Sequence, residues 1–389
     1  MKDPSREMED WVLQLRREFH MYPELSGQEI RTTRRVLEIL GDLGVETRPL
    51  ENMTGAVGVI RGSQEGFTLA IRADMDGLPI EELNEVHYRS RHKGVMHACG
   101  HDAHTAIVLG VARAVLESQW RSSMKGNLLL LFQPSEERVS GAREMISRGV
   151  LDGPRVDWVI ACHVVPDLPA GTVGFFRGPS HASADSFSLL IRGRGTHGGR
   201  PHEGVDPILA AAHFVTALQS IVSRNIKPTE PAVVSVGKFH AGSVGNVIPE
   251  SAELEGTVRA LSEETRGNIM RRLEELRHGM DRSFGVESRL EFQEGVPVCV
   301  NDPEVSGFLY QVALDLLGPQ QVLYLEPAMG AEDFALFARE RPSSIFRLGC
   351  GKGQEIAYAP LHSPHFDMDE SCLMIAVRIF TEAARRLLS

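Results

Sequence analysis

The fold is organised around the stretch Gly94-Val95-Met96-His97-Ala98-Cys99-Gly100-His101-Asp102-Ala103-His104-Thr105. Three histidines, one cysteine and one aspartate lie between positions 97 and 104, and imidazole and thiolate are strong protein ligands for divalent metals such as zinc. Cys99 and His101 cannot share one face of a helix, but an extended or turning segment aims both side chains at one point. The spacing therefore favours a metal site over the alternative, a set of loop histidines beside a buried cysteine.

A helix is predicted directly after this stretch, from Ala103 to Leu116, because its apolar residues suit burial against a core. We expect the side chain of Asp102 or Thr105 to cap its N-terminus.

The size and composition are those of a soluble globular protein with two domains. The chain has 389 residues, and its formal net charge of −11 argues against nucleic acid or an anionic membrane as a partner. No apolar run is long enough to span a bilayer, and no apolar signal region opens the chain, so we expect a cytoplasmic protein. The five scattered cysteines suit reduced thiols in that compartment: Cys99, Cys162, Cys299, Cys350 and Cys372.

Three apolar runs each lead into residues that can bind metal or transfer a proton. Leu69-Ala70-Ile71 leads to Asp74 and Asp76, Leu128-Leu129-Leu130-Leu131-Phe132 leads to Glu136 and Glu137, and Trp158-Val159-Ile160-Ala161 leads to Cys162 and His163. Continuous apolar runs that alternate with helical segments are typical of strands buried on both faces. Open α/β sheets carry their sites at the carboxyl ends of the strands. We therefore predict an α/β domain with a mixed, mostly parallel sheet, helices on both faces, and these motifs meeting at one edge.

Glu136 and Glu137 are adjacent at a strand end, so their side chains are expected to point in different directions. One can then bind metal while the other takes a proton from water. Taken alone, a histidine after a strand such as His163 is more often a core or rim residue than a metal ligand. His362 lies in a loop that Pro360 and Pro364 stiffen, which suits a ligand.

From about Asp185 the pattern changes to alternating strands and two capped helices. The predicted order β-α-β-β-α-β is that of a two-layer ferredoxin-like sandwich. We expect this domain, residues 185–296, to be inserted between two parts of the catalytic domain, residues 1–184 and 297–389.

Five motifs in the same order resemble those of one amidohydrolase subfamily. They are Met96-His97-Ala98-Cys99-Gly100-His101-Asp102-Ala103-His104-Thr105, Phe132-Gln133-Pro134-Ser135-Glu136-Glu137, Asn246-Val247-Ile248-Pro249, Gly330-Ala331-Glu332-Asp333-Phe334 and Leu361-His362-Ser363-Pro364. The subfamily comprises hippurate hydrolases, indole-acetyl-amino-acid hydrolases and N-acetyl-diaminopimelate deacetylases, which belong with the aminoacylase and carboxypeptidase-G metallopeptidases. The resemblance covers essentially the whole chain. It implies a zinc-peptidase-like catalytic domain with an inserted lid or dimerisation domain.

The resemblance also implies a site for two divalent metal ions, which could be zinc, manganese, nickel or cobalt. Carried over motif by motif, the metal ligands would be Cys99, His101, Glu137, His163 and His362. Glu136 would be the general base that activates water, and Asp76 would orient a ligand without binding metal itself. The broader family has a ligand histidine where this chain has Asp74, and the cysteine-containing subfamily takes its ligand from the Cys99 motif instead.

In the inserted domain, His197 matches a histidine that reaches the active site of the partner subunit in related dimers and stabilises an oxyanion. The resemblance thus implies a homodimer or homotetramer. Asn246 and Arg259 match positions that hydrogen-bond substrate, although a surface role suits Arg259 equally well. The remaining histidines that we take as structural or rim residues are His20, His104, His181 and His202.

The function that the resemblance implies is a metal-dependent amidohydrolase. It would cleave an N-acyl amino acid (N-acetyl, N-benzoyl or similar) to a carboxylic acid and a free amino acid. Ser135, Arg138, Gly198 and Gly199 depart from the usual motifs near the pocket, so the acyl group stays open. The alternatives are a carboxypeptidase or dipeptidase of the same superfamily, a non-catalytic binding protein on this fold, and a hydrolase with Cys99 as its nucleophile.

Overall fold

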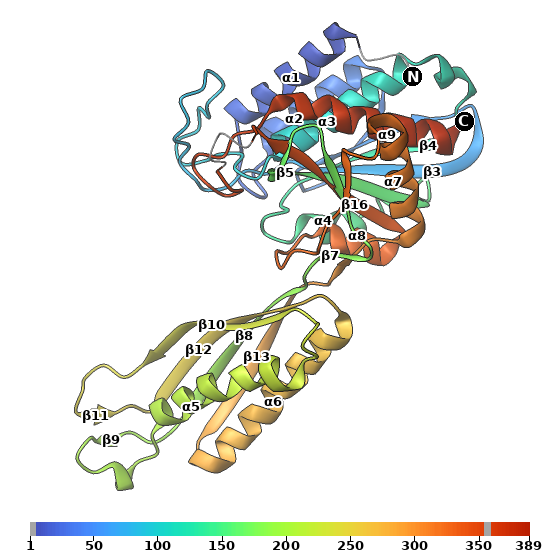
Figure 1. Cartoon of the computed structure of the whole chain (residues 1–389). Coiled ribbons are helices and arrows are strands. Elements are labelled where there is room, and N and C mark those ends of the chain that lie inside the picture. The colour runs from blue at the N-terminus through green and yellow to red at the C-terminus, as the bar shows by residue number, and fades with distance from the viewer. Residues whose placement is uncertain (1–4, 354–358) are drawn as a thin grey trace. The chain divides into compact units, whose positions relative to one another are not determined.

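The computed structural model describes residues 5–353 and 359–389, and the chain folds into two compact units (Figure 1). The described residues up to Gly178, those of Val300–Glu326 and those of Asp333–Ser389 form the first unit. Pro179–Cys299 and Pro327–Glu332 form the second.

The first unit contains an eight-stranded sheet with the order β1-β2-β4-β3-β5-β16-β6-β15. Its strands are β1 Glu46–Pro49, β2 Ala56–Arg61, β3 Gln64–Asp74, β4 Lys125–Gln133, β5 Trp158–Pro169, β6 Val173–Phe175, β15 Val322–Tyr324 and β16 Ser343–Gly351. The central strands β4, β3, β5 and β16 are parallel neighbours, whereas β1, β2 and the β16–β6 pair are antiparallel. The predicted mixed, mostly parallel sheet is confirmed.

Helices cover both faces of this sheet. They are α1 Arg6–Met21, α2 Ile30–Asp42, α3 His101–Leu116, α4 Gly141–Ser147, α7 Pro303–Leu317, α8 Phe334–Glu340 and α9 Leu373–Leu388, with short 3₁₀ turns at Gln119–Ser123 and Glu370–Cys372. In Figure 1, α1, α2, α3 and α9 lie above the sheet and α4 and α8 lie below it. Among the described residues, no helix is long and apolar enough to cross a membrane.

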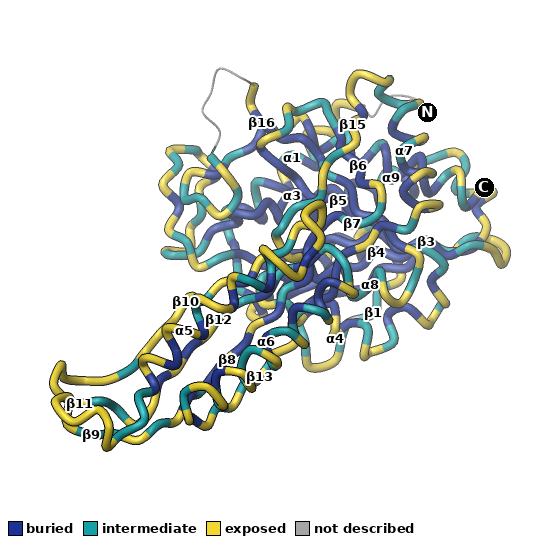
Figure 2. Tube along the Cα trace, turned by 60° about the horizontal axis from the view of Figure 1, so that its bottom comes forward, coloured by how far each residue is buried: buried dark blue, intermediate teal, exposed yellow. Residues whose placement is uncertain are grey.

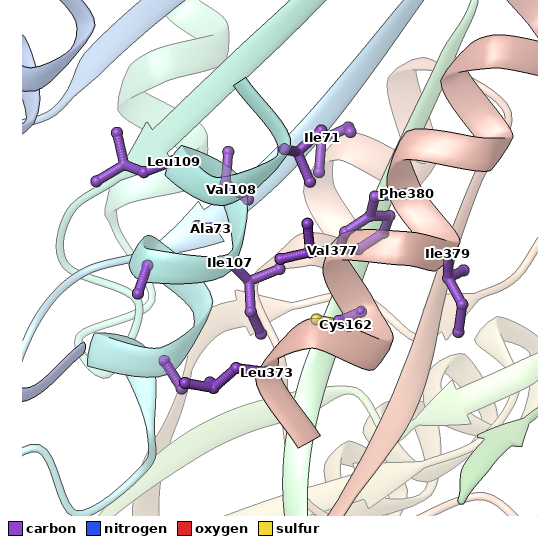
Figure 3. Close-up of a cluster of buried hydrophobic side chains, with 14 of the residues drawn as sticks. Ile71, Ala73, Ile107, Val108, Leu109, Cys162, Leu373, Val377, Ile379 and Phe380 are labelled. Carbon is purple, nitrogen blue, oxygen red and sulfur yellow. The ribbon is translucent and has the colours of Figure 1, made fainter. Parts of the chain in front are cut away.

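The core that positions α3 lies between this helix, α9 and the central strands. Figure 3 shows Ile107 and Val108 of α3 packed beside Val377 of α9 and Ile71 of β3. Each such side chain contributes about 1.5–3 kcal/mol on burial. A Cβ atom at Gly110 of α3 would lie only 2.8 Å from Val12 and 3.0 Å from Val377, so α3 is held tightly between its neighbours.

The predicted cap of α3 is wrong. The helix begins at His101, and its N-cap is Gly100 in the left-handed region at φ 82°, with no side-chain cap. The carboxylate of Asp102 instead accepts a hydrogen bond from His20, and the hydroxyl of Thr105 donates to the backbone oxygen of Asp74. Tertiary partners therefore take both predicted capping side chains.

The position predicted for His163, directly after its strand, is also wrong. β5 continues to Pro169 because residues beyond Ala161 pair with β16, where His163 lies opposite Arg347. The pairing with β3 does end at Ala161, opposite Arg72. His163 is therefore a strand residue just past the end of that pairing.

The second unit contains a four-stranded antiparallel sheet with the order β10-β12-β8-β13. Its elements are β8 Ala184–Arg192, α5 Pro207–Ser220, β10 Ala232–Ala241, β12 Ser251–Ala260, α6 Glu263–Phe284 and β13 Glu287–Val296. Shorter elements are β7 Pro179–His181, β9 Thr196–His197, β11 Val247–Ile248, the 3₁₀ turn Pro201–Glu203 and the π turn Ile221–Asn225. The strand β14 Cys299–Val300 contains the last residue of this stretch of the second unit and the first residue of the next stretch of the first unit.

This order of strands and helices is β-α-β-β-α-β, which is the ferredoxin-like arrangement. Asp206 and Ser262 cap α5 and α6 with their side chains. The two helices pack on the sheet over a core of their own that includes Phe187, Phe214 and Leu273. Along β8 and β12, buried residues alternate with exposed or intermediate ones for most of each strand. Figure 2 shows both buried and exposed residues in this unit.

Candidate metal centre

Five polar side chains from distant parts of the sequence converge in the first unit: Cys99, His101, Glu137, His163 and His362. The ligand atoms of Cys99, His101 and His163 all lie within 4.8 Å of one another, and so do those of Cys99, Glu137 and His362. Cys99 is common to both groups.

The separations suit coordination of a cation. Cys99 Sγ lies 3.5 Å from His163 Nε2, and His362 Nε2 lies 3.4 Å from Glu137 Oε1. Two ligands of one tetrahedral zinc ion are about 3.3–3.8 Å apart, given metal–ligand bonds of about 2.0–2.3 Å. The spacing therefore fits ligands that share a small cation.

The hydrogen bonds that His163 and His101 make outside this cluster use Nδ1 of each ring, so Nε2 of each ring faces the cluster. His163 donates through Nδ1 to the backbone oxygen of Val164 at 2.8 Å, and His101 Nδ1 lies 3.2 Å from Asp76 Oδ1, which can only accept. His101 Nε2 is buried without a hydrogen-bond partner among the described residues, a state that costs about 1–3 kcal/mol. A cation at this position would satisfy it.

The pKa shifts of the cluster residues also suit a bound cation. Burial raises the pKa of the Cys99 thiol, so a thiolate here requires a neighbouring positive charge. Burial opposes a charge on His101, but Asp74, Cys99 and Asp76 together outweigh it, so the pKa of His101 lies well above its usual range. His362 is half-exposed, and Glu137 raises its pKa. The site as a whole thus favours positive charge.

Asp76 holds the surrounding residues in place and does not face the cluster as a ligand. Its Oδ1 accepts from His101 and from the backbone N–H of Glu136 at 3.1 Å, and its Oδ2 accepts from Ser26 at 2.7 Å and from the backbone N–H of Glu137 at 3.1 Å. Four donors occupy the carboxylate, which matches an orienting role.

Glu136 and Glu137 lie in a tight turn after β4, where Ser135 and Val139 adopt left-handed φ angles of 53° and 57°. Such a backbone costs about 1–2 kcal/mol per residue. Glu29 supports the turn by accepting from the backbone N–H of Ser135 at 2.8 Å. The Glu136 carboxylate accepts from the backbone N–H of Asp333 at 3.4 Å, and it lies within 4.8 Å of ligand atoms of His101 and Glu137.

A different cluster, formed by Asp74, His101 and His104, also has its ligand atoms within 4.8 Å. His104 cannot bind metal there, because Nδ1 is bonded to Asp74 and Nε2 accepts from the backbone N–H of Val164 at 2.9 Å. Asp74 is also paired with Arg72 at 2.7 Å. The position where the broader family has a ligand histidine is thus a carboxylate with partners of its own.

The residues predicted to bind substrate lie in the second unit. His197 of β9 and Asn246 are exposed and adjacent, since the backbone N–H of Gly198 donates to the Asn246 oxygen at 2.7 Å. His197 Nδ1 accepts from Gly199, which leaves Nε2 free. Arg259 is half-buried near the far end of β12 and donates to Thr257 and to the Val258 oxygen. At about 3.3 Å per residue it lies roughly 26 Å from Ser251 along the strand, so this unit does not bring Arg259 to His197.

Several supporting residues carry no signal strong enough to be found from the sequence. Ser26 and Glu29 contact the site from the segment before α2, and Arg72, His104 and Asp333 form a buried network behind it. Asp333 stands in one of the five motifs, but nothing in the motif indicates which group it binds. His104 is 1% exposed, so it is a buried residue rather than a rim histidine.

Comparison with known proteins gives a family match over most of the chain. The model of peptidase family M20/M25/M40 matches residues 70–386. An N-acetyl-L-cysteine deacetylase of Bacillus subtilis (strain 168) is 39% identical over 98% of this chain and 89% of its own length. Thermostable carboxypeptidase 1 of Saccharolobus solfataricus is 38% identical over 96% of this chain and 95% of its own.

Among solved structures, a dinuclear metal binding peptidase of the M20 family from Bacillus subtilis superposes with a TM-score of 0.87. It is 34% identical in sequence, and the match covers 99% of both chains.

Proposed function

The chain belongs to peptidase family M20/M25/M40, and from this premise we propose that it is a metal-dependent amidohydrolase that cleaves N-acyl amino acids. The observation that carries the proposal is the convergence of five side chains on one cluster, in which Cys99 belongs to both ligand groups: Cys99, His101, Glu137, His163 and His362. The deacetylase from B. subtilis acts, by its name, on an N-acetyl amino acid, and its similarity over nearly the whole chain supports the same reaction class here.

We infer that these five residues hold two divalent cations, as the name of the B. subtilis peptidase says of that protein. When bound, such cations would polarise the amide carbonyl and lower the pKa of water. The side chains supply the charge that this requires, because the Cys99 thiolate and the Glu137 carboxylate are the anionic members of the set. The candidate cations are zinc, manganese, nickel and cobalt: thiolate suits zinc, imidazole suits zinc and nickel, and carboxylate suits manganese.

Glu136 is the residue that we assign as general base. Its carboxylate lies beside the cluster, with one oxygen held by the backbone N–H of Asp333. It would take the proton from the attacking water and then deliver it to the leaving nitrogen. Asp76 would hold His101 and the backbone of Glu136 in position during both proton transfers.

The second unit would contribute to substrate binding. His197 lies at an exposed position of β9 next to Asn246, and its Nε2 has no hydrogen-bond partner among the described residues. A neutral imidazole or an amide can donate to a developing oxyanion. Arg259 carries a guanidinium suited to a substrate carboxylate. We also propose that the protein forms a homodimer through this unit, because the exposed His197 can then reach the site of a neighbouring subunit. The proposed location is the cytoplasm.

The carboxypeptidase name of the second relative makes peptide hydrolysis the competing function. Both reactions cleave an amide beside a carboxylate, and they differ in whether the acyl side carries a free amine. Rates with an N-acetyl amino acid and with the matching dipeptide separate them. We expect the N-acetyl compound to be cleaved at least ~10-fold faster in kcat/KM, which is about 1.4 kcal/mol of preference.

The test of the proposed chemistry is Glu136→Gln, which keeps the size of the side chain and removes the base. We expect its metal content to equal that of the wild type and its kcat to fall at least ~100-fold. Glu144→Gln on the exposed side of α4 is the matched control and should keep full activity. Normal turnover by Glu136→Gln would show that Glu136 is not the general base.

A further inference from the structure

His104 is a buried histidine of α3 that lies against two of the metal-site histidines without belonging to the metal cluster. Its ring stacks on that of His101 at 5.6 Å and meets the ring of His163 edge-on at 4.8 Å. Both of its nitrogens have partners within the protein.

The partners of His104 fix its tautomer. Nε2 accepts the backbone N–H of Val164, so it carries no proton, and Nδ1 must then be the N–H that donates to Asp74. The same residue, Val164, is also bonded through its oxygen, which accepts from Nδ1 of His163. Val164 thus links His104 to His163.

Asp74, the acceptor of His104, is itself immobilised. Arg72 donates to Asp74 at 2.7 Å, to Asp333 at 2.9 Å and to Gln133 at 2.7 Å. Gln133 in turn donates to both oxygens of Asp333 at 2.8 Å. These four side chains are at most 2% exposed, so water does not compete for the hydrogen bonds of this network.

We propose that His104 is a positioning residue of the metal centre: it binds no metal, and through the backbone of Val164 it holds the ring of His163 at the angle that coordination needs. Asp74 and Arg72 act behind it by keeping the proton on Nδ1. The inference rests on the proposed metal function and adds to it a residue that contacts two of the ligands and binds no metal itself.

The two contacts of His104 can be removed one at a time. In His104→Gln the amide oxygen reaches the position of Nε2 and can still accept from Val164, whereas in His104→Asn the amide nitrogen replaces Nδ1 and can still donate to Asp74. Both variants lose the ring, and Asn is one methylene group smaller than Gln, so the stability of each variant is measured beside its metal affinity. Each variant keeps one contact of His104 and loses the other, and the proposal assigns the metal affinity to the contact with Val164.

Cobalt(II) alone is the probe, added to metal-free protein and followed by its visible absorption, which reports the number and geometry of thiolate and imidazole ligands. We expect His104→Gln to bind cobalt within ~3-fold of the wild type and with the same spectrum. His104→Asn should bind at least ~10-fold more weakly, with an altered spectrum, as is typical when support for a ligand is lost. Thermal unfolding of the metal-free variants should show that both are folded at the temperature of the cobalt titration.

The outcomes separate the inference from the function on which it rests. Wild-type affinity and spectrum in folded His104→Asn, or equal impairment of both variants, refutes the positioning role alone. If His104→Asn does not fold, a tenfold weaker cobalt affinity in His104→Gln refutes it, and wild-type affinity there supports it. A wild-type chain that takes up no cobalt refutes the proposed function as well.

Discussion

The carboxylate of Asp76 offers a sharp perturbation of the site, because Asp76→Asn keeps the shape of the side chain and changes only one oxygen into a donor. In the wild type, each carboxylate oxygen accepts two hydrogen bonds. The new amide nitrogen must therefore face two donors. Either it meets His101 and the Glu136 backbone, or it meets Ser26 and the Glu137 backbone.

The second orientation costs less. The Ser26 hydroxyl can rotate and accept, which leaves only the backbone N–H of Glu137 without a partner, at about 1–3 kcal/mol. His101 keeps an acceptor on Nδ1 but loses the negative charge behind it. Loss of such support typically lowers metal affinity 10–100-fold, which is about 1.4–2.7 kcal/mol.

Two measurements check this prediction: urea unfolding of the metal-free protein, and zinc affinity by competition with a chelator. We expect Asp76→Asn to lose about 1–3 kcal/mol of unfolding free energy and at least ~10-fold in zinc affinity. Ser26→Ala removes one donor and leaves the charge, so it should stay within ~3-fold of wild-type zinc affinity. Zinc affinity in Asp76→Asn equal to that of Ser26→Ala would refute the orienting role.

Three further predictions follow from single contacts. Gly100→Ala should destabilise the metal-free protein by more than ~2 kcal/mol in urea unfolding, because its Cβ would lie 2.2 Å from Val164 at φ 82°. The control is Gly94→Ala, at φ 74° with open space around it, which should lose only about 1 kcal/mol of unfolding free energy. Equal losses in the two variants would contradict the clash with Val164. Burial alone would raise the pKa of Asp102, but Arg16 and His20 hold it well below its usual range, so its contribution to stability is complete above the unfolded pKa of about 3.9 and declines as the pH falls. Asp102→Asn should therefore lose most unfolding free energy between pH 5 and 8, with a smaller loss below about pH 4, and a loss independent of pH would count against this pairing. Cys99→Ser should lower the content of both metals after dialysis, since Cys99 belongs to both ligand groups, and loss of one metal with the other unchanged would show that it is not shared.

The elements of the fold were predictable where one signal dominates. The apolar runs of β3, β4 and β5 and the apolar residues of α3 reflect burial of these elements in the core. The capping residues Asp206 and Ser262 of α5 and α6 act locally. The cap of α3 was not predictable, because the carboxylate of Asp102 pairs with Arg16 and His20 instead. Both residues are more than 80 positions earlier in the chain. The length of β5 depends on a strand nearly 200 residues later, β16.

The same limit applies to the site. The carboxyl ends of β3 and β4 identify Asp76 and Glu137 as neighbours, since parallel strands end at one edge. Only the resemblance to the amidohydrolase subfamily distinguishes Asp74 from Asp76, although one binds Arg72 and His104 and the other holds His101. Residue type and spacing alone do not distinguish His104 from His101 either, because the choice depends on which ring nitrogen meets the Val164 backbone. Hydrogen-bond direction is a property of the packed structure.

The most direct test of the two-cation proposal is anomalous X-ray diffraction at the absorption edge of the metal with which the purified protein is loaded. We predict two peaks in the first unit, both next to Cys99, one among His101 and His163 and one among Glu137 and His362. A peak between Asp74 and His104, or a single peak at full loading, would contradict the proposal.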